Sequence, residues 1–341
     1  MDQTTLAKHS ADSLAARTRW RPLEILFWLA AFATIWLAPT HHLLLAEIAI
    51  LGLFALSLDL ILGYAGIISL GHAAFFGFGA YTAALLAKFE FINEPVLALI
   101  VAGFAAALLG FVTSFLVLRG TDLTRIMVTL GVALVLREVA NQNGWLTGGA
   151  DGLQGVTMQP ILGRFRFDMF GHNGYIYCLV TLFVMTMVAR RIVNSPFGLS
   201  LQSIRNNPLR AAALGINVNA RLVVVYTIAA FYAGVAGALL AQTQAFASLA
   251  YFDFDRSADL LMMLIIGGTG YLYGGVIGAM VFKIMQDYLS TLTPQYWLFW
   301  IGLLLVVIVM IGRDRIAGWA SPVRDLLLKL DMAIHRTRTG S

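Results

Sequence analysis

The sequence predicts an all-α polytopic membrane protein with about ten transmembrane spans, and three observations support this fold class. First, 59% of the residues are hydrophobic and only 12% are charged, whereas a soluble domain carries about 25% charged residues. Second, the apolar residues form long runs that are separated by polar segments. Third, the basic residues are clustered. A chain of 341 residues with this composition fits one multi-span domain, expected at residues 23–312.

Residues 1–22 are expected to form a polar tail on the cytoplasmic side, because they include four basic residues and Lys and Arg are enriched on that side. They show no pattern of a cleavable signal peptide. The first span is expected at 23–39. His41 and His42 follow it in a short loop. They are a candidate metal pair, but no third ligand lies nearby, so interfacial histidines are the favoured interpretation.

The second span, 43–62, runs directly into a glycine-rich stretch at 63–81, which contains five glycines.

The uncharged core of the fifth span, predicted at 124–140, is short, with Arg125 before it and Arg137 and Glu138 after it. We expect Arg137 and Glu138 at the outer interface, where docking of a binding protein and plain snorkelling both fit. The third to tenth spans are predicted at 70–87, 96–118, 124–140, 174–193, 221–243, 257–269, 272–289 and 296–312.

Charge supports the count of ten. The segment 190–221 contains five arginines and no acidic residue, and the tail 313–341 contains six basic and three acidic residues. Ten spans put both segments and the amino-terminal tail on the cytoplasmic side. Fusing the two short spans within 257–289 would put the carboxyl tail outside, although a kinked re-entrant pair fits equally well. Residues 326–330 of this tail are a candidate amphipathic surface helix.

The glycine-rich stretch has two interpretations. Non-helical backbone survives in a membrane only where protein or a water-filled cavity covers it, and glycine-interrupted apolar segments indicate transport sites. The alternative is tight helix packing through small residues. A second stretch of this kind is Gly267-Gly268-Thr269-Gly270-Tyr271-Leu272-Tyr273-Gly274-Gly275.

The polar segment 194–220 carries the strongest local signals. Residues 199–206 can form a short helix, Pro208 suits the start of a second helix and Gly215 suits its end. The second helix, at 209–214, is rich in alanine. Its small side chains, with Arg205 and Arg210 beside them, would let it fit a groove on a cytoplasmic partner. The simpler alternative is a connector.

Four motifs in this chain resemble those of the branched-chain amino acid permease family of ATP-binding-cassette importers. They occur in family order: Gly-Tyr-Ala-Gly with Ser-Leu-Gly-His-Ala-Ala-Phe within 63–81, Leu-Thr-Gly-Gly-Ala-Asp-Gly-Leu at 146–153, Ile-Arg-Asn-Asn-Pro-Leu-Arg-Ala-Ala-Ala-Leu-Gly-Ile-Asn at 204–217, and Gly-Gly-Thr-Gly-Tyr-Leu-Tyr-Gly at 267–274. The resemblance implies a bacterial or archaeal inner-membrane subunit that works with a second homologous permease, two ATPases and an extracytoplasmic binding protein. It also implies inverted repeats of spans two to five and seven to ten.

The resemblance also implies roles for individual residues. Contacts with the ATPase are expected at Ile204, Arg205, Asn206, Pro208, Arg210, Ala211, Ala212 and Gly215. The translocation path or its inner gate is expected at Asp59, Gly63, Tyr64, Gly66, Ser69, Gly71, His72, Gly267, Gly268, Gly270 and Gly274. From their chemistry, Asp59 is expected to pair with an adjacent span or to line the path, and His72 to hydrogen-bond backbone freed at the helix restart.

The chain is not expected to be an enzyme. It has no Gly-Lys dipeptide and hence no phosphate-binding loop of the usual form, so ATP and Mg²⁺ are expected in the partner ATPases and no cofactor or metal in this chain. Cys178, the only cysteine, is expected to be a buried apolar side chain. No nucleic-acid partner is expected.

Branched-chain amino acids are the expected cargo. Arg210, Asp59 and Arg125 depart from the family pattern and leave urea, another amino acid or a small carboxylate as alternatives. A secondary transporter is a less favoured class, since it would need more buried carboxylates than Asp59.

Overall fold

The computed structural model describes residues 22–120, 122–161, 163–165, 168 and 171–311. The expected cytoplasmic tails and the candidate surface helix at 326–330 lie outside these residues, apart from Pro22. The chain divides into two compact units, which are described separately. Of the described residues, the first unit holds Ala30–Val281 and the second holds 22–29 and 282–311.

A helix occupies each of the ten predicted spans. They are α2 (Pro22–Leu37), α3 (His42–Leu62), α4 (Ala73–Lys88), α5 (Pro95–Val117), α6 (Asp122–Gln142), α8 (His172–Val193), α11 (Val218–Gln244), α12 (Phe254–Gly267), α13 (Gly274–Leu292) and α14 (Trp297–Ile311). Among the described residues, four segments are long and apolar enough, by length and composition, to cross a membrane: Pro39–Leu62, Pro95–Val117, His172–Val193 and Val218–Gln244. The all-α polytopic class is therefore confirmed, and the count of ten spans stays a prediction.

Short helices fill the connections. The loop before α3 is a 3₁₀ turn, η1 (Pro39–His41). The long polar loop after α6 contains α7 (Gly144–Thr147) and η2 (Gly149–Asp151), and the polar segment after α8 contains α9 (Pro196–Asn206) and α10 (Pro208–Ala213). The turn after α11 contains η3 (Leu249–Phe252).

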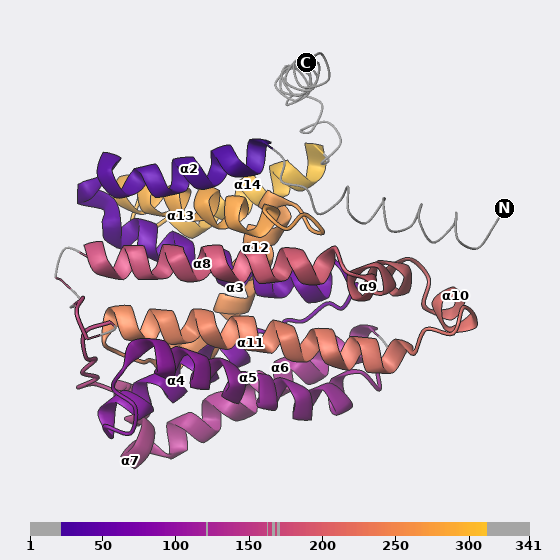
Figure 1. The fold of residues 1–341 in the computed structure, drawn as a ribbon, viewed down its shortest axis with the longest axis horizontal. Helices are drawn as coiled ribbons and strands as arrows, with labels where there is room; N and C mark the ends of the chain where they lie inside the picture. The colour runs from indigo at the N-terminus through magenta and orange to yellow at the C-terminus, as the bar shows by residue number, and fades with distance from the viewer. Residues whose placement is uncertain (1–21, 121, 162, 166–167, 169–170, 312–341) are drawn as a thin grey trace, which may run out of the picture. The chain divides into compact units, whose positions relative to one another are not determined.

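The core of the first unit is built around α3 and α11. Helix α11 packs against α3, α4 and α5, and α3 packs in addition against α8 and α12 (Figure 1). Helix α3 is buried almost from end to end, as expected for a helix that is apolar on all sides and surrounded by other helices. Small residues allow the close approach of α4 and α11: a Cβ on Gly79 would overlap the backbone of Gly234, and one on Gly237 would overlap the carbonyl of Phe76.

In the second unit the described residues are the first turns of α2, the end of α13, and α14. Its buried apolar side chains include Trp28, Phe282 and Ile301, at 4%, 1% and 2% exposure. Phe27 and Trp28 pack edge to face, with ring centroids 5.4 Å apart. This unit contains none of the predicted site residues.

Candidate functional site

Two interruptions of helical structure lie together in the first unit. The first break is residues 63–72, between α3 and α4, and the second break is residues 268–273, between α12 and α13. Gly66 has φ 76° in the first break, and Gly268 and Gly270 have φ 93° and 79° in the second, conformations that glycine adopts at little cost. A Cβ on Gly63 would lie 2.5 Å from the amide nitrogen of Gly270. The backbones of the two breaks are therefore in direct contact.

Asp59 connects the two breaks. It lies in the last turn of α3 and is fully buried, and its Oδ1 accepts a hydrogen bond of 2.7 Å from the backbone N–H of Gly270. A buried carboxylate is costly unless such donors reach it. Of the two roles that the sequence left open for Asp59, the geometry supports pairing, with the backbone of the second break as the partner.

Arg205 connects α9 to the same place. Its Nη1 donates a hydrogen bond to the carbonyl oxygen of Gly63, and its aliphatic carbons lie against Gly66. A Cβ on Gly270 would lie 3.0 Å from this guanidinium nitrogen. The predicted ATPase-contacting segment and both predicted gate segments thus meet at one point, which we call the junction: Asp59, Gly63, Arg205 and Gly270.

Other predicted gate residues surround the junction. Tyr64 and Ser69 are buried in the first break. The hydroxyl of Tyr64 lies near Asp59, Arg205 and the backbone of Leu272, which interact with it electrostatically. Gly267 ends α12 just before the second break, and a Cβ there would overlap the carbonyl of Gly274, the first residue of α13. The N–H of Gly274 donates to the carbonyl of Tyr271 over 2.6 Å.

The carboxyl side of the first break is held by hydroxyl groups. The N–H of Leu70 donates to Oγ1 of Thr129 on α6 over 3.3 Å, and the N–H of Ala73 donates to Oγ of Ser257 on α12 over 3.0 Å. Gly71 packs so closely on α6 that a Cβ would overlap the carbonyl of Thr129. Donors left open at a helix start need such partners, and here neighbouring helices supply them.

The prediction for His72 was wrong in its partner. Its Nε2 is 2.8 Å from Oγ of Ser57 on α3, whose hydroxyl also lies 2.5 Å from the carbonyl of Phe54. The ring of His72 stacks on that of Phe54, with centroids 5.8 Å apart. His72 is fully buried and joins α4 to α3 through a side chain, while Ser257 serves the freed backbone.

The segment between α8 and α11 consists of well-defined short helices. Pro208 is the first residue of α10 and Gly215, with φ 85°, follows its last turn, as predicted. Helix α9 begins at Pro196, three residues before the predicted start, because Ser195 caps it by accepting from the N–H of Gly198. Asn206 ends α9.

The predicted contact face of α10 needs correction. Ala211 is buried, and Ile204 of α9 is buried as well, so both hold the segment on the bundle. The exposed apolar side chains are Leu209 and Leu214, at 83% and 74% exposure. Arg210 and Ala212 are exposed between them. Leucine therefore provides most of the apolar surface that the sequence analysis assigned to alanine.

At the opposite end of the bundle the motif 146–153 pairs with the turn after α11. Leu153 and Ala247 exchange backbone hydrogen bonds of 2.7 and 3.2 Å. Gly148 and Gly152 have φ near 80°, and a Cβ on Gly152 would meet the ring of Phe246. Leu146 and Thr147 line an apolar cavity of about 610 Å³ with side chains of α4, α6 and η3.

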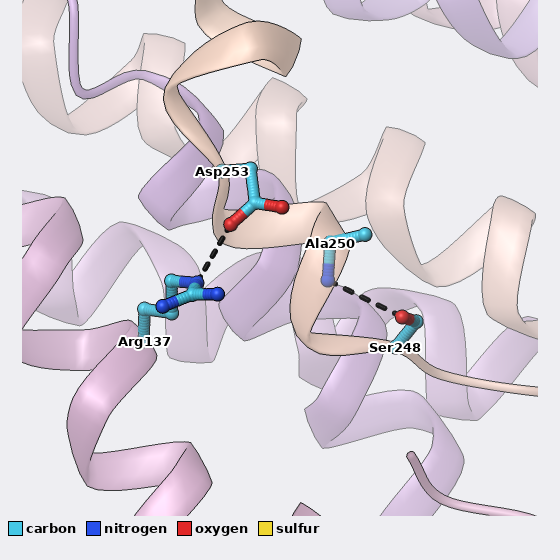
Figure 2. A network of polar contacts seen from close by, with 4 residues as sticks. All are labelled: Arg137, Ser248, Ala250 and Asp253. Carbon is cyan, nitrogen blue, oxygen red and sulfur yellow. Dashed lines mark hydrogen bonds and ion pairs between the residues drawn. The ribbon is translucent and has the colours of Figure 1, made fainter. Parts of the chain in front are cut away.

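Arg137 at the end of α6 has an ion partner in the same region. Its Nε lies 2.6 Å from Oδ1 of Asp253, beside the turn in which Oγ of Ser248 accepts from the N–H of Ala250 (Figure 2). Glu138 accepts from Nε2 of Gln142 over 2.6 Å. Both side chains of the ion pair are more than a third exposed, so the pair contributes little to stability.

No group of three or more potential metal ligands occurs among the described residues. His42 is buried, lies 3.2 Å from the carbonyl of Ile35 through Nε2 and packs on His172 with ring centroids 4.9 Å apart. Cys178 is fully buried, as predicted.

Sequence reasoning missed four polar residues, three around the first break and one near the start of α3. Ser57, Thr129 and Ser257 supply the hydroxyls around the first break, and Glu47 lies within α3, near Tyr251. Their only signal is a polar side chain inside an apolar run, which most membrane helices also show.

The chain matches the family model described as branched-chain amino acid transport system, permease component, over residues 42–309. It is 27% identical over 285 residues to the high-affinity branched-chain amino acid transport system permease protein LivM of Escherichia coli (strain K12), which covers 77% of this chain and 66% of LivM. The chain thus spans slightly less than two thirds of that relative. It is 24% identical over 257 residues to a probable branched-chain amino acid transport permease protein LivH of Methanocaldococcus jannaschii, covering 71% of this chain and 78% of LivH.

Sugar permeases are also similar. The ribose import permease protein RbsC of Bacillus subtilis (strain 168) is 27% identical over 293 residues, covering 80% of this chain and 84% of RbsC. No solved structure matches the chain.

Proposed function

This chain belongs to the branched-chain amino acid transport system permease family, and from that premise we propose that it is the membrane-spanning subunit of an ATP-driven, binding-protein-dependent importer. The family match over residues 42–309 carries the proposal. The exposed surface of α10 beside the junction supports it, because an importer of this kind needs a place where a cytoplasmic ATPase can act on the bundle.

The proposed partners are a second homologous permease, two cytoplasmic ATPases and an extracytoplasmic binding protein. ATP and Mg²⁺ would be bound by the ATPases. Both termini and the segment of α9 and α10 would face the cytoplasm, in keeping with the five arginines at 190–221. The motif at 146–153 and the Arg137–Asp253 pair would then face outward.

Branched-chain amino acids are the proposed cargo, since the family model and LivM share that name. Another amino acid, urea or a small carboxylate is the second candidate, because Arg210, Asp59 and Arg125 depart from the family pattern. Permeases named for sugars are also similar, at nearly the same identity. Ligand screening of the cognate binding protein would separate these cargoes. A binding protein that takes a sugar and no amino acid would contradict the proposed cargo.

Leu209 and Leu214 are the proposed anchors on the ATPase. Exposed leucines on a short helix suit an apolar groove on a partner, and Arg210 between them suits an acidic rim. We propose further that movement of α10 is passed through α9 to the first and second breaks, which open or close the inner end of the path.

Co-purification tests the assignment. The chain is expressed with candidate ATPases from neighbouring genes of its operon, extracted in detergent and purified. We expect the ATPase to be retained by the native chain and lost from Leu209→Asp. Trp145→Asp is the matched control, since Trp145 is equally exposed, at 82%, but lies at the opposite end of the bundle. An ATPase that never co-purifies with the native chain would contradict the importer assignment and favour a secondary transporter.

Uptake into vesicles tests coupling. Gly215→Pro and Arg205→Glu should each reduce ATP-dependent uptake at least ~10-fold, the loss expected from ~1.4 kcal/mol or more of coupling free energy, while membrane insertion is kept. Unchanged uptake in both variants would remove the coupling role of this segment.

A further inference from the structure

We propose that Asp59 and Arg205 form a charged latch that holds the first break against the second and ties both to α9. The latch consists of two hydrogen bonds between segments far apart in the sequence. Its effect on the shape of the first break follows from the contacts of this chain alone. Its use in transport rests on the proposed function.

The first bond of the latch satisfies a carbonyl that the end of α3 leaves open. The N–H of Ile67 donates to the carbonyl of Ile61 and so leaves the carbonyl of Gly63 to the guanidinium of Arg205, 142 residues away in sequence. A cation near the carboxyl end of a helix is also favoured by the helix dipole. Arg205 therefore stabilises the end of α3 by geometry and by charge.

The second bond joins the breaks themselves. Oδ1 of Asp59 accepts from the N–H of Gly270, 211 residues away in sequence. The fit permits only glycine at 63 and 270: a Cβ on Gly63 would overlap Oδ1 of Asp59, and Gly270 has φ 79° and lies against Arg205. Any separation of the two breaks must therefore lengthen this bond.

Electrostatics make the two bonds interdependent. A carboxylate in the last turn of a helix is disfavoured by the helix dipole, and full burial adds a desolvation cost. The guanidinium of Arg205 offsets both, since its Nη1 lies 3.0 Å from the Cβ position of Gly270, the residue whose N–H bonds to Asp59. Withdrawal of Arg205 should therefore also weaken the hold of Asp59 on Gly270. In this way a displacement of α9 opens the contact between the breaks.

Cysteine labelling of the chain alone tests the latch without any partner. Ala65 lies in the first break and is 5% exposed, so Ala65→Cys in a Cys178→Ser background reacts with a maleimide only when the break opens. We expect Arg205→Ala and Asp59→Ala each to raise the labelling rate about 10-fold or more, as loss of a hydrogen bond to a charged group predicts. Arg191→Ala, which removes an exposed cation at the end of α8, should leave the rate unchanged.

Further variants make the result specific. The Asp59→Ala/Arg205→Ala double variant should label within about twofold of the faster single variant, because both bonds belong to one unit. If the increases in labelling rate of the two single variants multiply in the double variant, the two bonds act independently and the single latch is overturned. Asp59→Asn keeps an acceptor oxygen but no charge and should label at an intermediate rate; a native rate would overturn the role of charge.

Two controls guard against general loosening. Native Cys178 is fully buried outside the junction, so its labelling should stay slow in the Asp59 and Arg205 variants. An equal rise in the labelling rate of Cys178 would overturn the proposal. So would an unchanged labelling rate of Ala65→Cys when Asp59 or Arg205 is replaced. The guanidinium of Arg205 was predicted to contact the ATPase but bonds to Gly63 within the bundle. In the co-expressed complex we therefore expect Arg205→Ala to keep the ATPase, which Leu209 and Leu214 would hold, but to lose at least about 10-fold in ATP-dependent uptake. If no ATPase co-purifies but the labelling rates change as expected, the proposed function fails and the latch stands.

Discussion

The two halves of the glycine-rich stretch share a composition and differ in what glycine does. In residues 63–72 the backbone leaves the helix, and Gly66 takes a left-handed conformation. In residues 73–81 the backbone is the regular first half of α4. There Gly77 and Gly79 leave room for the ring of Phe252 and the backbone of α11. The packing interpretation is thus confirmed for the second half. The first half is non-helical and covered by protein, and its part in transport stays a prediction.

The difference shows what decides the use of a glycine in a membrane bundle. A glycine with positive φ in a break between helices, such as Gly66, marks a position where conformation matters. A glycine inside a helix that crosses another helix marks a position where distance matters. We expect replacement of the first kind to lower the stability little and the uptake strongly, and replacement of the second kind to do the reverse.

The largest effect is expected in the second half. Gly79→Ala places a Cβ on the backbone of Gly234, and such overpacking costs about 1–3 kcal/mol or more. The melting temperature of the detergent-solubilised chain should fall by several degrees. Gly131→Ala is the matched control, since nothing lies within 4 Å of that Cβ, and it should be neutral or stabilising. Equal melting temperatures for the two variants would remove the distinction drawn for α4.

A smaller effect on stability is expected in the first half. Gly66→Ala forces a left-handed alanine, at about 1–2 kcal/mol, and moves a methyl group against Arg205. Gly155 has the same φ of 76° with nothing within 4 Å, so Gly155→Ala carries the same backbone cost alone. Both variants should melt at similar temperatures, while only Gly66→Ala should lose uptake. Equal uptake in the two would show that the first break does not move during transport.

The smallest effect is expected from Arg137→Ala. Its partner Asp253 follows Phe252 in the sequence, and the ring of Phe252 packs against Gly77. The ion pair is therefore expected to help position this ring. Because the pair is exposed, its loss should cost only about 0.2–1 kcal/mol and less at high salt. Chemical denaturation at two salt concentrations measures this cost. A loss above about 2 kcal/mol would mean that the ion pair, and not the glycine contact, positions the ring.

Much of the fold could be predicted because it depends on local composition. Long uncharged runs predicted a helix at every span, and Pro208 and Gly215 marked the limits of α10 through their own backbone preferences. The start of α4 was placed three residues early, at 70 rather than 73. Residues 70–72, Leu-Gly-His, follow the apolar run without a break in composition, and the hydroxyls of Thr129 and Ser257 that bind the N–H groups on either side of them come from distant helices.

The arrangement of the site could not be predicted, because it depends on contacts between distant segments. Nothing near Asp59 indicates that Gly270 lies opposite, and nothing near Arg205 indicates the carbonyl of Gly63. The orientation of Ala211 was missed for a related reason. A six-residue helix gives too few positions for a periodic pattern, so which side faces the bundle is decided by the packing of α9.

Capping of consecutive helices has a mechanical consequence. Ser195, Asn207 and Asn217 cap α9, α10 and α11 in turn, each by accepting a backbone N–H three residues on, and the links between these helices are only a few residues long. Such a segment has few flexible residues, so α9, α10 and the start of α11 should move together as a stiff unit with low elastic compliance. A displacement of α10 would then displace Arg205 on α9 at the same time. The motions of α10 and of Arg205 should therefore relax with a single time constant.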